Sequence, residues 1–112
     1  MERTKQEVLA QVALFIAALT VFCNGKRAGT PYSYVFETQV GSKNIRIVRR
    51  ELWKGQEAPT NGSVHCFIDA ATGNILKAES FKRPAPQIRG SIFNPNFDIG
   101  RAVGEYGAAY IR

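Results

Sequence analysis

The N-terminal segment limits the possible folds of this chain most strongly, because it reads as a long helix that is apolar on nearly every side. Apolar residues recur at helical spacing along one side of the stretch from Glu2 to about Cys23: Val8, Val12, Phe15, Ile16, Leu19 and Phe22. The complementary side is apolar as well: Leu9, Ala13, Ala17, Ala18 and Val21. Asn24 and Gly25 then form a typical C-terminal stop.

A helix of this kind is buried on more than one side. A chain of 112 residues has little material with which to enclose it completely. We therefore expect one face to cover the sheet of its own protomer and the other face to meet a second subunit. The alternative is a fully enclosed core helix.

The middle of the chain predicts about four antiparallel strands. Residues 32–40 alternate apolar and polar side chains, Gly41-Ser42 turns the chain, and residues 44–53 form the partner strand. A third strand spans 63–69, with Val64, Cys66 and Ile68 expected on one face, and a fourth spans 74–80. One long helix on such a sheet makes an α+β fold. We expect a single domain: a helix at 1–25, a sheet at 32–80, and an irregular tail at 81–112 with a short helix between 98 and 106.

The charge of the chain favours phosphate-bearing partners. Fifteen Lys and Arg residues against nine Asp and Glu residues give a net charge of +6, which does not distinguish nucleic acid from a small nucleotide. Arg46 and Arg50 share one face of the second strand. They form either a stripe that faces phosphate or a solvated sheet edge.

The residues needed for catalysis or metal binding do not form a recognisable group in the sequence. His65 is the sole histidine and lies in the middle of a strand, so a structural or surface role is favoured over a general base. The carboxylates are scattered singly, and Cys23 and Cys66 lie in apolar runs without zinc spacing. We expect buried free thiols, no metal, no cofactor and no enzymatic activity.

The location predicted from the sequence is the cytoplasm. The apolar run at 8–23 is short for a membrane span and is interrupted by Gln11 and Thr20. The leader is charge-balanced and no cleavage site of small residues follows.

The segment Phe81–Arg112 combines Gly, Pro and Asn with aromatic and basic side chains, which indicates an ordered, cationic, aromatic-lined surface for a nucleotide. Arg89-Gly90-Ser91 has the chemistry of a phosphate cradle, or is a plain turn. Phe81 is a stacking platform or a core residue. The tail offers four further candidates. Asn94 either binds a base edge or belongs to a turn, and Arg101 and Arg112 are basic residues of the tail. Tyr106 lies near the chain end, which suggests that the tail docks.

Four stretches of the tail carry a resemblance to a known family: AspAlaAlaThrGlyAsnIleLeuLysAla at 69–78, SerPheLysArgProAla at 80–85, ArgGlySerIlePhe at 89–93 and GluTyrGlyAlaAlaTyrIleArg at 105–112. Together they resemble the phage-encoded Thoeris anti-defence proteins of the first type, which act as sponges for a nucleotide signal. The resemblance covers residues 66–112, and the N-terminal helix is similar only in character.

The resemblance implies an α+β protomer whose N-terminal helix serves in a homo-oligomer, either a dimer or a hexamer. It also implies sequestration, without cleavage, of cyclic ADP-ribose isomers made by bacterial TIR-domain proteins in the infected host. Phe81 would stack on the adenine and Asn94 would hydrogen-bond to the polar edges of the ligand. Arg112, with Arg101, would bind the pyrophosphate across a subunit boundary.

Some members of that family hold cyclic di- or trinucleotides at a separate site. In this chain such a site would use Lys26 or Arg27 with Arg89 and Ser91. Two rival functions stay open: a module that binds nucleic acid along an extended basic face, which we consider less favoured, and a structural phage accessory protein that binds no nucleotide.

Overall fold

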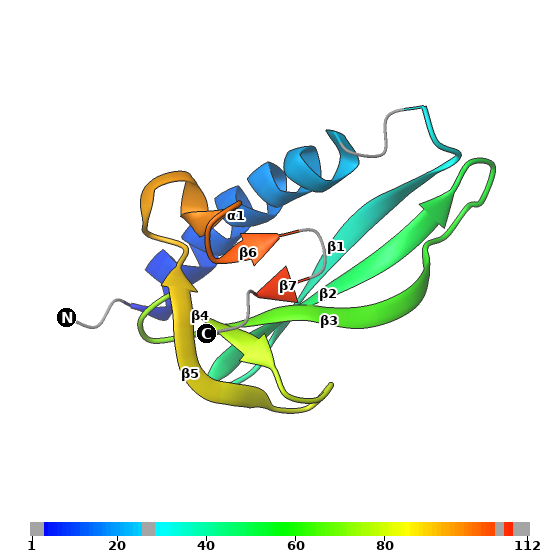
Figure 1. The fold of residues 1–112 in the computed structure, drawn as a ribbon. Helices are drawn as coiled ribbons and strands as arrows, with labels where there is room; N and C mark the ends of the chain where they lie inside the picture. The colour runs from blue at the N-terminus through cyan, green and yellow to red at the C-terminus, as the bar shows by residue number, and fades with distance from the viewer. Residues whose placement is uncertain (1–3, 26–28, 105–106, 109–112) are drawn as a thin grey trace.

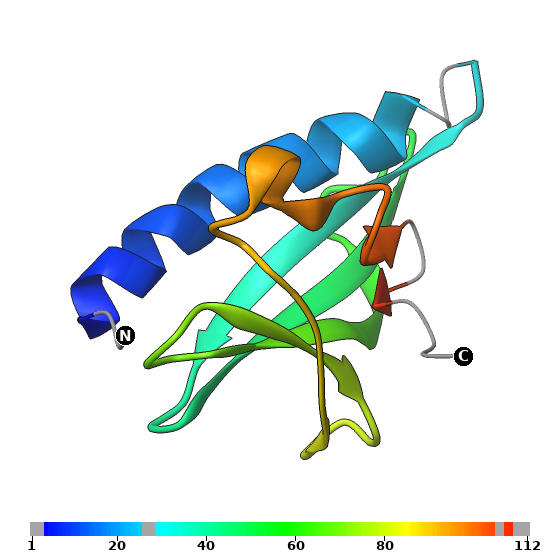
Figure 2. The same ribbon diagram turned by 60° about the vertical axis from the view of Figure 1, so that its left-hand side comes forward.

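The structure, a computed structural model, describes residues 4–25, 29–104 and 107–108. It confirms the α+β class: helix α1 (Lys5–Gly25) packs on a five-stranded antiparallel sheet in the order β1-β2-β3-β4-β5 (Figures 1 and 2). The strands span Tyr32–Val40, Asn44–Trp53, Thr60–Asp69, Asn74–Ala78 and Pro84–Ser91. A short turn, η1 (Pro95–Asp98), and a ribbon of β6 (Val103–Gly104) and β7 (Gly107–Ala108) follow.

A capping box begins the helix. The Glu7 amide donates to Thr4 Oγ1 and the Thr4 amide donates to Glu7 Oε1, both at 3.1 Å. This reciprocal pair satisfies two backbone donors that a helix N-terminus leaves unpaired. The helix therefore begins at Lys5, later than the Glu2 expected from periodicity alone.

One face of α1 fills the core. Five residues at helical spacing are buried: Val8, Val12, Phe15, Leu19 and Cys23. On the opposite face, Leu14 is 58% and Val21 is 75% exposed, so the helix is not a fully enclosed core helix within the protomer. By length and composition α1 is also able to cross a membrane, although its buried face packs on the sheet. Contact of the exposed face with a second subunit stays a prediction.

One end of the helix is tied to β1 and the other end to the turn that follows β1. Asn24 Nδ2 donates to the Tyr34 carbonyl and Asn24 Oδ1 accepts from the Tyr34 amide, at 3.1 and 2.7 Å. Lys5 Nζ donates to the Gly41 carbonyl at 3.2 Å. The helix thus runs antiparallel to β1, and Figure 2 shows it lying along that side of the sheet.

The sheet contains one strand more than the sequence pattern indicated. β5 falls in the segment expected to be irregular, because Pro84 and Pro86 lack the amide that an inner strand must donate. β5 is the last strand of the sheet, where proline is tolerated. The short helix expected between 98 and 106 is wrong: the helical turn lies earlier, at Pro95–Asp98, and β6 occupies Val103–Gly104.

A bulge in β3 changes the face of Val64. Ile47 pairs with Cys66 while the next residue, Val48, pairs with Val64, which leaves His65 as the extra residue. Consecutive residues of β2 face opposite sides of the sheet, so Val64 and Cys66 do too. The expectation that Val64 shares a face with Cys66 is therefore wrong, whereas Cys66 and Ile68 are both buried in the core under the helix.

Candidate anion-binding site

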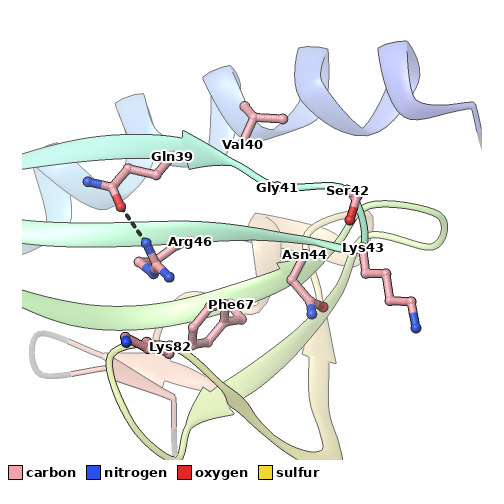
Figure 3. A pocket seen from close by; sticks show the side chains of 9 residues that line it. All are labelled: Gln39, Val40, Gly41, Ser42, Lys43, Asn44, Arg46, Phe67 and Lys82. Carbon is pink, nitrogen blue, oxygen red and sulfur yellow. Dashed lines mark hydrogen bonds between the residues drawn. The ribbon is translucent and has the colours of Figure 1, made fainter.

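A hollow of about 280 Å³ lies between the β1–β2 turn and the β4–β5 turn (Figure 3). It is lined by Gln39, Val40, Gly41, Ser42, Lys43, Asn44, Arg46, Phe67 and Lys82. Three of these side chains are cationic and none is a carboxylate. A lining of this composition favours an anionic ligand.

Arg46 is the central group of this hollow. Its Nη1 donates to Gln39 Oε1 at 2.7 Å, and Figure 3 shows this bond above Phe67 and Lys82. The guanidinium carbon lies 4.6 Å from the ring centre of Phe81 and 5.8 Å from that of Phe67, a cation–π arrangement. Within the described chain the buried Nε of Arg46 has no hydrogen-bond partner.

The neighbouring Arg50 differs from Arg46 in one respect. Both lie on the same face of β2, as expected, but Arg50 forms a salt bridge of 3.0 Å with Glu37. In the described ranges Arg46 has only the neutral Gln39 and the two aromatic rings as partners. Since β2 lies between β1 and β3, the alternative that these arginines solvate a sheet edge is wrong.

Phe81 belongs to the turn between β4 and β5. The turn is closed by the amides of Glu79 and Ser80, which both donate to the Arg83 carbonyl, at 3.0 and 3.1 Å. The side chain is 49% exposed, so the alternative that Phe81 is a core residue is wrong. An exposed ring with a guanidinium against it is suited to stacking on a flat ligand.

Ser91, Asn94 and Arg101 meet at a different place, around the buried carboxylate of Asp98. Asp98 Oδ2 accepts from the Ser91 amide at 2.9 Å and from Asn94 Nδ2 at 2.7 Å. Arg101 Nε donates to Oδ1 at 3.0 Å and Nη2 donates to Oδ2 at 3.1 Å. Burial raises the pKa of the Asp98 carboxyl, but these donors outweigh burial and the net pKa lies below its ordinary value.

Two residues of the predicted phosphate cradle, Gly90 and Ser91, therefore contact an anion of the protein itself. A side chain at position 90 would overlap the Asp98 carboxylate, so glycine permits this close approach. An external phosphate here would meet the negative charge of Asp98. Ligand binding by Ser91, Asn94 and Arg101 stays a prediction, and none of the three lines the hollow around Arg46.

The remaining candidates divide into one described residue and four others. Arg89 lies on β5, and in the part of the chain covered by the structure its buried Nε and Nη1 have no hydrogen-bond partner. Lys26, Arg27, Tyr106 and Arg112 lie outside the described residues. Their predicted roles, including the second nucleotide site, stay predictions.

His65 has a structural environment, as favoured from the sequence. Its ring is buried, Nε2 lies 2.6 Å from the Gly104 carbonyl and Nδ1 lies 3.4 Å from Cys66 Sγ. Burial lowers the pKa of His65 to about 4 against the opposing effect of the bond to Gly104, and the charge of Arg49 lowers it further. Cys23 and Cys66 are buried free thiols, and burial raises the pKa of Cys66. Across residues 4–25, 29–104 and 107–108, no His, Cys, Asp and Glu side chains group as metal ligands.

Sequence reasoning missed Lys43 and Lys82 as site residues, and it left open whether Arg46 faces phosphate or a solvated sheet edge. Lys43 and Lys82 lie in two turns that are distant in the sequence, so no local pattern joins them. The available signal was Arg46, whose strand position opposite Phe67 places a cation beside an aromatic ring.

A second hollow, of about 420 Å³, lies at the other end of the β1–β2 hairpin beside Tyr32 and Trp53. Among the lining residues that the structure describes, Lys54 is the one cation. The described lining of this larger hollow therefore carries one cation, against three in the hollow around Arg46.

Comparison with known proteins places the chain in one family. The model of a family of unknown function (DUF7717) matches residues 1–99. No curated protein and no solved structure matches the chain.

Proposed function

We propose that this chain, which belongs to the DUF7717 family of unknown function, binds an anionic nucleotide in the hollow around Arg46 and retains it uncleaved. The observation that carries the proposal is the Arg46 guanidinium, without a carboxylate partner in the described chain, against the exposed ring of Phe81. The resemblance to Thoeris anti-defence proteins supports a cyclic ADP-ribose isomer as the ligand. Sequestration would then block Thoeris-type immunity in the cytoplasm of an infected bacterium.

The chemistry of the site supports both the binding of a nucleotide and its retention without cleavage. A guanidinium donates two parallel hydrogen bonds to a phosphate, and Lys43 and Lys82 add point charges beside it. Phe81 is not among the lining residues, but its ring lies against the Arg46 guanidinium and offers a stacking surface to a base. Retention without cleavage is supported because the described residues that line the hollow include no carboxylate, thiol or imidazole that would act as a general base.

The volume of the hollow indicates how much of the ligand it holds. Its size of about 280 Å³ is near the lower end for small-molecule sites. The hollow would hold the pyrophosphate and one ring, and the rest of a cyclic ADP-ribose isomer would contact residues outside it.

Arg46→Gln tests the central contact. We expect the Kd for cyclic ADP-ribose isomers to rise about 10- to 100-fold, because a charge-assisted hydrogen bond contributes about 1.5–3 kcal/mol. Arg50→Gln is the matched control, since Arg50 lies on the same face of the same strand but is neutralised by Glu37. Titration calorimetry measures both variants, and equal effects of the two substitutions would reject the site.

A second pair of variants tests the β4–β5 turn. Phe81→Ala should abolish binding, and Lys82→Gln should weaken it by several-fold while Arg83→Gln, whose side chain faces Glu79, leaves it unchanged. Arg112→Ala should also abolish binding if the tail takes part as predicted. Parental affinity in both Phe81→Ala and Arg112→Ala would show that the site is elsewhere.

The fate of the ligand separates sequestration from catalysis and from the rival functions. Heat denaturation of the complex should release the ligand chemically intact, as chromatography and mass spectrometry would show. An altered ligand would establish an enzyme. A steep loss of affinity with salt, over many phosphates, would instead favour nucleic acid, and no binding to any nucleotide would favour a structural role.

A further inference from the structure

The outer edge of β1 carries unpaired backbone groups. β1 is the first strand of the sheet, and among the described strands only β2 pairs with it. The Gly41 amide donates to the Asn44 carbonyl across the turn, so these two residues form a hydrogen-bonded pair. Hydrogen-bonded and non-hydrogen-bonded pairs alternate along an antiparallel ladder, and the odd-numbered residues of β1 are therefore the ones that exchange hydrogen bonds with β2. The even-numbered residues direct their amides and carbonyls away from the sheet.

Asn24 satisfies one of these outward residues. Its side-chain amide pairs with both the amide and the carbonyl of Tyr34, as a neighbouring strand would. Further along the edge, the structure gives the amides and carbonyls of Phe36, Thr38 and Val40 no such partner within the described chain. Val40 is also 53% exposed, although it is a large apolar residue. A sheet edge of this kind is a template for another strand.

We propose that the edge of β1 at Phe36–Val40 pairs antiparallel with the same segment of a second copy of this chain, centred on Thr38. In this register Thr38 meets its symmetry mate and Phe36 meets Val40, so all three outward residues are paired. The pairing stops before Tyr34, which Asn24 already occupies.

Side-chain chemistry selects this register over its neighbours. Glu37 lies opposite Gln39 of the partner subunit, so the carboxylate faces a side-chain amide that can donate a hydrogen bond to it. A shift that centres the pairing on Glu37 would place two carboxylates opposite each other, which destabilises a sheet. On the helix side, Phe36 opposite the partner's Val40 buries the apolar surface that Val40 exposes in the protomer.

The antiparallel pairing relates the two copies by a two-fold axis through Thr38. The position of helix α1 is compatible with this axis. Both helices lie on one face of the continuous sheet and run antiparallel to each other, because each runs antiparallel to its own β1. The side of α1 that carries Asn24 presents four further residues at spacings of four, three and four: Leu9, Ala13, Ile16 and Thr20. Small and apolar side chains at this spacing permit close packing of two helices. This interface does not depend on the ligand.

Sedimentation of Thr38→Pro tests the edge pairing. The wild-type chain should sediment at twice the protomer mass of 12.4 kDa, and Thr38→Pro should sediment at that mass. Proline removes an outward amide but no bond within the protomer, and sheet edges tolerate it. Thr38→Val keeps the amide and should remain a dimer. A monomeric wild type, or a dimeric Thr38→Pro, would overturn the proposal.

Cross-linking tests the register, even if Thr38→Pro fails to fold. Two residues directly opposite at a hydrogen-bonded position have Cα atoms about 5.5 Å apart, within the range for a disulfide. Thr38→Cys should therefore form a covalent dimer on oxidation, while Glu37→Cys should not. The native Cys23 and Cys66 are fully buried and give a low background. Absence of the Thr38→Cys cross-link, or its equal formation by Glu37→Cys, would overturn this register.

Discussion

Among single residues, His65 makes the stability of the fold depend on pH. Burial is the main cause that lowers its pKa from 6.5 to about 4. Between these two pH values the unfolded chain binds a proton that the folded chain excludes. Stability is therefore fully present above pH 6.5 and is lost as the pH falls toward 4.

We expect the free energy of unfolding to fall by about 3 kcal/mol across this range, at about 1.36 kcal/mol for each pH unit of the pKa difference. Urea denaturation at a series of pH values measures the fall. His65→Gln should remove this part of the pH dependence, because glutamine does not titrate. An unchanged pH profile in His65→Gln would contradict the assignment.

Among the elements, η1 and the end of β5 depend on one carboxylate. Asn96, Phe97 and Asp98 all have left-handed backbone conformations, with φ between 54° and 55°, which non-glycine residues rarely adopt. The four donor contacts to Asp98 and the packing of Phe97 on Phe15, with ring centres 6.3 Å apart, offset this strain.

Asp98→Ala should lower the free energy of unfolding by about 2–4 kcal/mol, because it leaves buried donors unpaired and places alanine in a left-handed conformation. Asp98→Asn is the matched control, since asparagine keeps an acceptor oxygen and tolerates that conformation. Chemical denaturation should show a smaller loss for Asp98→Asn. Equal losses, or no loss in Asp98→Ala, would show that this cluster does not anchor the tail.

For the whole molecule, the sequence predicted the helix and four strands because periodicity reports which side faces the core. It did not predict β5, since the prolines that suit an edge strand also suit a loop. It misplaced Val64, because a bulge shifts the register by one residue without a local signal. Strand order and register depend on contacts between segments that are distant in the sequence, and local patterns carry no information about these contacts.

The candidate site divides in the same way. From the sequence, Phe81 was either a stacking platform or a core residue, because its position after the fourth strand does not show whether its ring is exposed; the structure shows that it is. Asn94 and Arg101 were identified as polar and cationic, but the partner that holds them, Asp98, is recognised only when its burial is known. Lys43 and Lys82 line one hollow only because two separate hairpin turns converge.

The bond from Asn24 to Tyr34 also has a consequence for the order of folding. Asn24 belongs to the helix, so the outward groups of Tyr34 stay open until the end of α1 docks on β1. Before docking, the unpaired edge of β1 extends from Phe36–Val40 back to Tyr34. Two copies of the chain can then pair along this edge in several competing registers, as in the early steps of aggregation. The docked side chain shortens this edge and leaves one preferred register. Asn24 would thus act as a gatekeeper against aggregation as well as a fastening for the helix.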